Sequence, residues 1–163
     1  MSSCMARTLT HLDAAGRVRM VDVGGKPVTA REAVARGRVS MRRATLDRLR
    51  SGRVPKGEAL TAAHLAGVMA AKRTSELIPL AHPLALDGVD LVFRFDEAGP
   101  AVEIESRVRT RGRTGVEMEA LTAVAVAALT LYDMLKAVDR GMVIGEIALW
   151  RKSGGRSGTY RRR

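Results

Sequence analysis

Two long segments of the chain repeat apolar residues at the spacing of an α-helix. Across residues 56–78 apolar side chains recur every three or four positions, which predicts a helix with one buried face. Pro79 ends that helix, because proline lacks a backbone N–H and clashes with the turn before it. A second helix, which contains a long apolar segment, begins within residues 114–119 and runs to about Arg140. Gly141 is its expected stop.

Three other segments have the pattern of β-strands. Val89–Phe95 places its apolar residues on one face, and Val102–Val108 alternates apolar with charged residues. Ala98–Pro100 lies between them and predicts a hairpin connection. Residues 142–150 form a last strand that bends at Gly145.

In the first third of the chain, the sequence patterns that indicate helices, strands and turns are shorter. Gly24–Pro27 predicts a turn. Thr29–Glu32 matches a capping box, in which the Thr and Glu side chains bond free N–H groups at a helix start, so a short helix is expected to run to Gly37. Arg38–Met41 is a candidate short strand, and residues 44–50 form one or two helical turns.

The order strand, helix, strand, strand, helix, strand predicts the fold class. It is the βαββαβ pattern of ferredoxin-like α+β domains, with an antiparallel sheet and helices on one face. Residues 1–15 are expected to form a flexible N-terminal arm, residues 16–158 a single α+β domain with extra short helices, and residues 159–163 a basic C-terminal tail. The other face of the sheet is available for oligomerisation.

The amino-acid composition indicates which residue types form the core and in which cellular compartment the protein is expected. Only 3% of the 163 residues are aromatic, so the core is expected to consist of Leu, Val, Ala and Met. No apolar run reaches the roughly 20 residues that span a bilayer, which predicts no membrane association. The first residues lack the apolar segment of a secretory signal. Cys4 alone cannot form an internal disulfide, and these features together favour a cytoplasmic protein.

The net charge of +11 is concentrated toward the C-terminus. Residues 151–163 hold six basic residues and no acidic residue, which leaves +5 for residues 1–150. A solvated basic terminus explains this charge. Attraction to a polyanion, either nucleic acid or the phosphates of a nucleotide, explains it as well.

Charged side chains at both ends of the second long helix are candidates for chemistry. A charged group on an apolar helix is unfavourable without a partner. Asp133 and Lys136 are three residues apart and share one helical face. Glu117 and Asp133 are separated by roughly 24 Å along a helix. Within one copy the two ends can join in one site only if another element bridges them, so a site that uses both ends is expected to lie between two copies of the chain.

Other candidates are single residues and a loop. His82 precedes Pro83, which favours a rigid, extended position suited to proton transfer, although an ordinary polar loop residue is an equal alternative. Lys56 lies at a helix start, where a cation is unfavourable, and is either an anion ligand or proton donor or an ordinary surface lysine. The glycine–serine loop 152–158 can bind an anion through backbone N–H groups. Three scattered histidines predict no zinc site.

Alternate positions from residue 107 to residue 113 are arginines. On a strand and its exit they would lie on one side and form a cationic stripe. The stripe either contacts a phosphate chain or solubilises that face. Its members are Arg107, Arg109, Arg111 and Arg113.

In this order, these motifs resemble the MoaC family of molybdenum cofactor biosynthesis proteins, the cyclic pyranopterin monophosphate synthases. The resemblance extends from about Leu12 to Gly158 and is specific because several segments match in fixed order. They are Met20–Val23, Ala70–Thr74, Ile78–Leu84, Thr114–Leu121, Tyr132–Met134 with Lys136, and Lys152–Gly155.

The resemblance implies a ferredoxin-like subunit in a homohexamer, a trimer of dimers with active sites between subunits. The implied reaction, of the lyase class, converts 3′,8-cyclo-7,8-dihydro-GTP into cyclic pyranopterin monophosphate with release of pyrophosphate. No metal site and no cofactor are implied, apart from a divalent ion that could accompany the triphosphate. The implied catalytic residues are Asp133, Lys136 and Lys56, and the implied substrate contacts are Leu80, Ala81, His82, Met118, Glu119, Glu117, Arg31, Arg109 and Lys152.

Two positions depart from the family pattern. Ala81 stands where the family usually has Cys, which argues against a nucleophilic or redox role there. Arg113 stands where a lysine is usual, which keeps the charge and changes the donor geometry.

A basic nucleic-acid-binding module on the same fold is the main alternative. It explains the charged terminus. However, acidic residues on a buried face, such as Asp133, Glu117 and Glu119, would repel phosphates, and the strands lack aromatic residues for base stacking if Phe93 and Phe95 lie in the core. A catalytically silent scaffold is a third hypothesis, against which the intact candidate residues argue.

Overall fold

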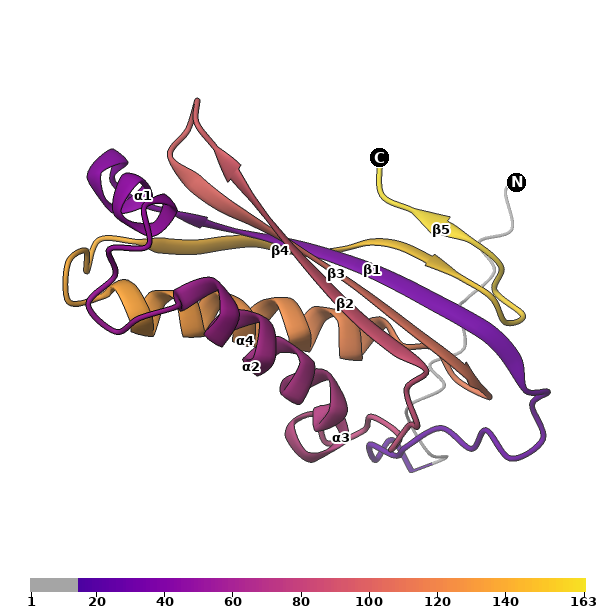
Figure 1. Ribbon diagram of the computed structural model, residues 1–163. Coiled ribbons are helices and arrows are strands. Elements are labelled where there is room, and N and C mark those ends of the chain that lie inside the picture. The colour runs from indigo at the N-terminus through magenta and orange to yellow at the C-terminus, as the bar shows by residue number, and fades with distance from the viewer. Residues whose placement is uncertain (1–14) are drawn as a thin grey trace.

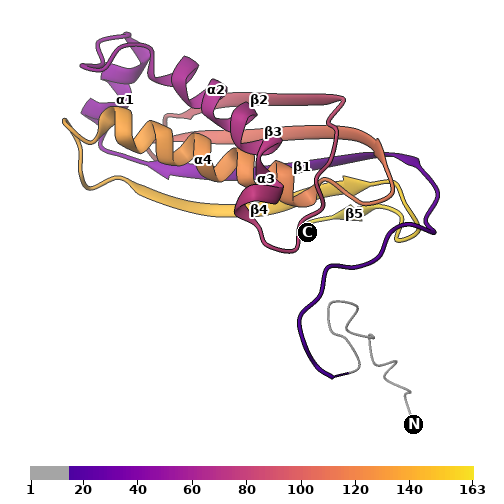
Figure 2. The same cartoon turned by 90° about the horizontal axis from the view of Figure 1, so that it is seen from below.

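The computed structural model describes residues 15–163, which form a five-stranded antiparallel sheet covered by helices on one face (Figure 1; Figure 2). The elements in chain order are β1 (Thr29–Ser40), α1 (Arg43–Arg50), α2 (Ala59–Lys72), α3 (Thr74–Leu77), β2 (Gly88–Asp96), β3 (Ala101–Gly112), α4 (Glu117–Leu135), β4 (Val143–Ser153) and β5 (Tyr160–Arg161). The strand order is β2-β3-β1-β4-β5, and every neighbouring pair is antiparallel.

The predicted ferredoxin-like fold class is confirmed. The chain order β1-α2-β2-β3-α4-β4 is the βαββαβ arrangement, to which α1, α3 and β5 are additions. The predicted hairpin joins β2 to β3, and the predicted turn at Gly24–Pro27 is closed by a hydrogen bond from Lys26 N to Val23 O. The predicted flexible arm falls, except for residue 15, outside the described residues.

The helix predicted over residues 29–37 is wrong, because this segment is the central strand of the sheet. β1 pairs with β3 on one side and with β4 on the other. Its residues Ala33, Ala35 and Val39 are fully buried in the core between sheet and helices. A capping box is a local signal, and hydrogen bonding to two strands distant in the sequence outweighs it. The short strand predicted after Gly37 is the end of β1.

Other element boundaries differ by a few residues. The helix expected over 56–78 is divided into α2 and α3 at Arg73, and it begins only after a turn in which Gly57 has a φ of +88°. α4 ends at Leu135, short of the predicted end. The predicted bend at Gly145 is present, because the register of β4 against β1 shifts beside it.

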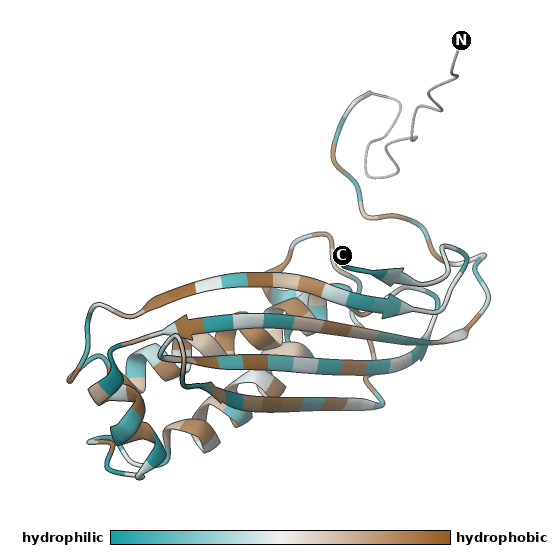
Figure 3. Cartoon of the chain, turned by 90° about the horizontal axis from the view of Figure 1, so that it is seen from above, coloured by the Kyte–Doolittle hydropathy of each residue, from teal (hydrophilic) through white to brown (hydrophobic). Residues whose placement is uncertain are grey.

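Small side chains allow α2 and α4 to approach closely. A Cβ added to Gly67 of α2 would lie 3.0 Å from the carbonyl oxygen of Ala123 and 2.6 Å from Leu91 Cδ2. Figure 3 shows apolar residues distributed along the helices and alternating with polar residues along the strands. α4 has the length and composition of a membrane span, but its packing against the sheet and α2 accounts for its apolar character without a membrane.

The two phenylalanines of β2 differ in burial. Phe93 packs against the core, as predicted. Phe95 is 37% exposed and lies 5.9 Å from the Arg50 guanidinium, so its predicted core position is wrong. The reason is that the charged helix α1, rather than the apolar helices, lies beside this end of β2.

A buried carboxylate joins the segment after α4 to the start of α1. Asp139 accepts hydrogen bonds from the backbone N–H of Arg42 at 3.0 Å and of Gly141 at 3.1 Å, and from Thr45 Oγ1 at 2.9 Å. Burial alone would raise the pKa of Asp139, but these hydrogen bonds outweigh it and hold the pKa below its ordinary value. Asp139 therefore caps α1 from outside that helix.

Candidate active site

The C-terminal end of α4 carries a carboxylate held between two ammonium groups. Asp133 Oδ2 lies 2.8 Å from Lys56 Nζ, and Asp133 Oδ1 lies 2.7 Å from Lys136 Nζ. Lys56 Nζ also donates to the backbone carbonyl of Asp133 at 2.9 Å. The Gly57 turn before α2 places Lys56 here, and the i,i+3 spacing on α4 places Lys136.

The charge state of this cluster follows from its hydrogen bonds. The hydrogen bond from Lys136 and, to a smaller extent, the one from Lys56 lower the pKa of Asp133 to about 2. The carboxylate is therefore ionised at neutral pH. The expectation of a buried face is wrong for Asp133, whose side chain is 54% exposed because it points away from the core at the last turn of α4. The cluster has one excess positive charge and is open to an anionic ligand.

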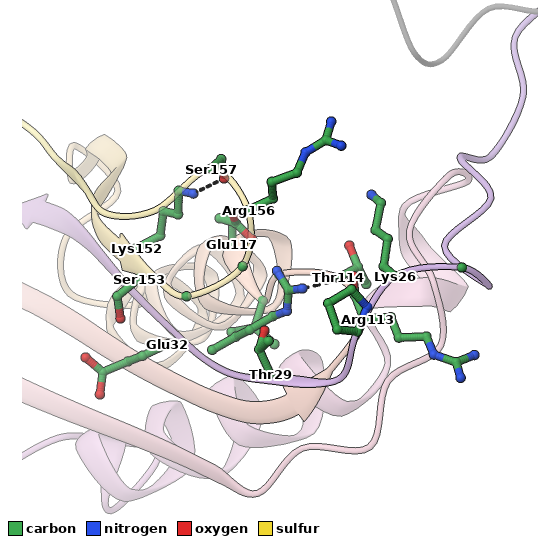
Figure 4. Close-up of a pocket in the computed structure, with 17 residues that line it drawn as sticks. Lys26, Thr29, Glu32, Arg113, Thr114, Glu117, Lys152, Ser153, Arg156 and Ser157 are labelled. Carbon is green, nitrogen blue, oxygen red and sulfur yellow. Dashed lines mark hydrogen bonds between the residues drawn. The ribbon is translucent and has the colours of Figure 1, made fainter.

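The opposite end of α4 borders a cavity of about 660 Å³. Its walls come from the turn before β1, the start of β1, the loop before α4 and the loop after β4 (Figure 4). Figure 4 shows Lys152 and Arg156 on one side and Lys26 and Arg113 on the other. Because five of its side chains are cationic and two are acidic, the cavity suits an anion. The cationic residues are Lys26, Arg31, Arg113, Lys152 and Arg156.

Arg31 is held rigidly at this cavity. Its Nε donates to the Gly112 carbonyl at 2.9 Å and its Nη2 to the Arg113 carbonyl at 3.1 Å. Among the described contacts Nη1 makes no hydrogen bond. Arg31 therefore presents unused donors, pre-oriented by the backbone of the β3 exit.

The loop after β4 depends on two consecutive glycines. Gly154 and Gly155 have φ values of +91° and +71°, a region that side chains disfavour. A Cβ at Gly154 would collide with the Ala30 carbonyl, and a Cβ at Gly155 would collide with the Arg31 guanidinium. The absence of side chains thus allows the loop to close over β1 and lets a ligand approach its backbone.

A second cavity, of about 410 Å³, adjoins the first and shares the loop before α4. It contains His82, whose Nε2 lies 2.8 Å from the Val21 carbonyl. A carbonyl only accepts hydrogen bonds, so Nε2 is the protonated nitrogen that donates in this contact. His82 is therefore oriented by the segment that precedes β1.

Glu119 is the most buried acid of this cavity, with 4% of its surface exposed. Burial raises its pKa to about 7, and the charge of Glu117 adds to the increase. Glu119 can therefore hold or release a proton near neutral pH, as a general acid or base must.

We expect Glu119→Gln to remove part of the pH dependence of stability. The proton on Glu119 stabilises the folded state fully below the ordinary pKa of 4.5, and this contribution is lost as pH rises through about 7. Between pH 5 and pH 8 the wild type should therefore lose about 1–2 kcal/mol more than the variant. Thermal unfolding of both proteins at the two pH values measures this difference. Parallel pH profiles would contradict it.

The structure divides the predicted site residues into two groups. Asp133, Lys56 and Lys136 meet at one end of α4, and most of the implied substrate contacts surround the two cavities at the other end. Asp133 follows Glu117 by 16 residues on α4, which holds the groups roughly 24 Å apart. The cavity group comprises Arg31, Leu80, Ala81, His82, Glu117, Met118, Glu119 and Lys152.

Arg109 belongs to neither group. It lies on the open face of the sheet, where its Nη2 is 3.0 Å from Asp90 Oδ2. Arg107 and Arg111 are exposed on the same face, as the stripe predicts, whereas Arg113 lies beyond the strand at the cavity. Arg109 and Arg31 both line a separate surface depression, which links Arg109 to the first cavity.

Two cavity residues were not singled out from the sequence, whereas Arg156 belongs to the glycine–serine loop that was predicted to bind an anion. Lys26 follows a glycine turn, and Thr29 begins β1. Their positions next to glycines or a strand start are weak signals, because a surface turn has the same composition. The hydroxyl of Thr29 is buried and finds no hydrogen-bond partner within residues 15–163.

Comparison with known proteins gives matches over nearly the whole chain. The model of the MoaC family matches residues 20–155. The cyclic pyranopterin monophosphate synthase of Pelotomaculum thermopropionicum is 64% identical over 155 residues, which are 95% of this chain and 91% of that protein. The protein of the same name from Thermomicrobium roseum is 65% identical over 94% of this chain and 93% of its own, and that from Parvibaculum lavamentivorans is 58% identical over 96% and 98%.

Proposed function

The chain belongs to the MoaC family, and from this premise we propose that it is a cyclic pyranopterin monophosphate synthase of molybdenum cofactor biosynthesis. It converts 3′,8-cyclo-7,8-dihydro-GTP into cyclic pyranopterin monophosphate and releases pyrophosphate. The observation that carries the proposal is a cationic, glycine-lined cavity directly beside a buried acid whose pKa is near 7. The high identity to enzymes of this name supports it over a nucleic-acid-binding module.

The cationic cavity binds the triphosphate. Arg31 has unused guanidinium donors, and Lys152 stands at the base of the glycine loop. When a hydroxyl of the substrate attacks the α-phosphorus, the bond to the departing pyrophosphate breaks and negative charge moves onto that group. Cations fixed in advance at this position stabilise the charge as it develops.

Proton transfers accompany the rebuilding of the purine-derived ring into a pterin. Lys56 and Lys136 carry protons, and Asp133 orients both ammonium groups through its two oxygens. Glu119 and His82 provide a second acid–base pair beside the triphosphate cavity. Ala81 supplies no thiol, so the chemistry at that position is restricted to contact with the substrate.

A complete site requires two copies of the chain. Because the lysine–aspartate cluster and the cavities lie roughly 24 Å apart, each site combines one end of α4 from each of two subunits. The assembly is a homohexamer, a trimer of dimers. Exposed apolar residues on α2 and α4 support burial of this layer between copies, namely Leu65, Met69 and Leu129.

The remaining properties are those of a cytoplasmic enzyme without a resident cofactor. Residues 15–163 contain no group of three His, Cys, Asp or Glu side chains that could hold a metal ion. A divalent ion that accompanies the triphosphate would be bound mainly by the phosphates. Arg109 contacts the substrate only if its ion pair with Asp90 opens.

Incubation of the purified protein with 3′,8-cyclo-7,8-dihydro-GTP tests the function. Pyrophosphate and the oxidised pterin product should appear together with the wild type. Lys56→Ala should lower the rate by at least about 100-fold, because it removes a proton-transfer group. A folded, assembled wild-type protein that forms neither product would overturn the proposal.

A further inference from the structure

Among residues 15–163, four arginines after β4 form no ion pair. The side chains of Arg156, Arg161, Arg162 and Arg163 are exposed, and within the described part of the chain none of them forms an ion pair. Glu32, which faces this segment across the sheet, is already bound to Arg151. The segment therefore keeps a net positive charge, although Arg162 borders a depression that also contains Glu146.

The backbone of this segment is held beside the cationic cavity. β5 pairs with β4 so that Tyr160 lies opposite Lys152 and Arg161 opposite Arg151. The N–H of Arg162 donates to the Trp150 carbonyl at 2.9 Å. Paired strands are about 5 Å apart, so residues 161–163 start within about 15 Å of the cavity wall at Lys152. Figure 1 shows β5 beside β4 at this end of the sheet.

The side chains of residues 161–163 are not ligands of the cavity. Lys152 and Arg156 line it, but the three later arginines do not. Arg162 instead borders a depression on the open face of the sheet, near Trp150 and Glu146. Any effect of these arginines on a bound triphosphate must therefore act through the electric field and not through contact.

We propose that Arg161, Arg162 and Arg163 steer the anionic substrate toward the cavity. This inference rests on the proposed function, because it requires a ligand with a triphosphate group. Uncompensated cations beside a concave, positively charged entrance raise the association rate of an anion. The Debye length is about 10 Å at 0.1 M salt, so steering from this distance is strong in dilute buffer and weak in concentrated salt.

A graded series of variants separates charge from structure. Arg161, Arg162 and Arg163 are replaced together by Lys, by Ala or by Glu, which gives net charges of +11, +8 and +5 without changing the β5 backbone. The association rate of a fluorescent GTP analogue is measured by stopped flow at 20 mM and 300 mM salt. Turnover is measured on the same samples, and their assembly is checked by size-exclusion chromatography.

The expected result is an association rate set by net charge. At 20 mM salt the Lys variant matches the wild type, the Ala variant associates about 3–10-fold more slowly, and the Glu variant is slower again. At 300 mM salt the differences shrink below about 2-fold. The turnover number and the dissociation rate stay unchanged, because the cavity is intact.

Two outcomes would overturn the inference. Equal association rates across the series at low salt would leave the arginines as a solvated surface. A loss that persists at high salt, or that appears in the Lys variant, would indicate a structural role for the guanidinium groups. If the wild type binds no triphosphate at all, the proposed function itself fails, and the two failures are therefore distinguishable.

Discussion

Replacing Asp133 with Asn is expected to lower the turnover number by about 10²–10⁴-fold while the protein remains folded and assembled. The carboxylate bridges Lys56 and Lys136 at 2.8 and 2.7 Å, and an amide of the same shape has only one acceptor atom and no charge. The two ammonium groups would then repel each other and lose their shared orientation. Groups that transfer protons contribute rate factors of this size.

Steady-state release of pyrophosphate measures the effect, and circular dichroism checks the fold. Asp47→Asn on α1 is the matched control, since it makes the same change at an exposed position with no ion pair among the described residues. Unfolding temperatures should change little for either variant, because the side chains of the Asp133 cluster are about half exposed. A turnover number within about 3-fold of wild type would remove Asp133 from the mechanism.

The pKa of Asp133 also limits what can cause a loss of activity in acid. The carboxyl pKa is lowered to about 2 from an ordinary value of 3.8, so its ion pairs are complete above about pH 4 and are lost only as pH falls toward 2. A decline in activity between pH 5 and pH 7 therefore belongs to another group, such as Glu119, whose pKa is about 7.

Gly154→Ala is expected to raise KM by at least about 10-fold. The residue has a φ of +91°, and its added Cβ would meet the carbonyl of Ala30, which belongs to the central strand and cannot move. The loop must shift, and Lys152 and Arg156 move with it out of position for the triphosphate. A strained φ alone costs about 1 kcal/mol, and the collision with backbone adds to it.

Gly158→Ala is the matched control for this prediction. Gly158 also has a positive φ, +63°, but an added Cβ there would meet nothing within 4 Å. It should therefore show only the conformational cost, with a change in KM below about 5-fold. Titration of each variant with the fluorescent GTP analogue separates binding from turnover. Equal effects of the two substitutions would show that the contact with Ala30 is unimportant.

The spacing of apolar residues predicts those helices and strands whose buried positions repeat regularly along the chain. The βαββαβ order, the β2–β3 hairpin and the bend at Gly145 all follow from alternation, turn residues and helical spacing. β1 does not, because its capping box is local while its two partner strands lie about 70 and 110 residues away in the chain, as the pairs Ala35–Ser106 and Ala35–Leu149 show. A short sequence pattern contains no information about partner strands so distant in the chain.

The contacts among the predicted site residues follow only in part from the sequence. The spacing of Asp133 and Lys136 predicts their contact, but only tertiary structure brings Lys56 to the same carboxylate. Conversely, Arg109 was grouped with the cavity residues and instead pairs with Asp90. An alternating strand pattern shows which residues share a face of the sheet. It does not show which charged side chain each of them will pair with.

The length of α4 fixes the distance between the first cavity and the lysine–aspartate cluster. Its 19 residues connect the cavity at Glu117 to the cluster at Asp133 without a break, so its length sets how far apart these ends are in every copy. Inserting or deleting one residue would turn one end by about 100° and displace it by about 1.5 Å relative to the other. Substitutions inside the helix change its packing, whereas a change of length would alter both the spacing and the rotation of the cluster relative to the cavity. The number of residues in α4 should thus be less free to vary than their identity.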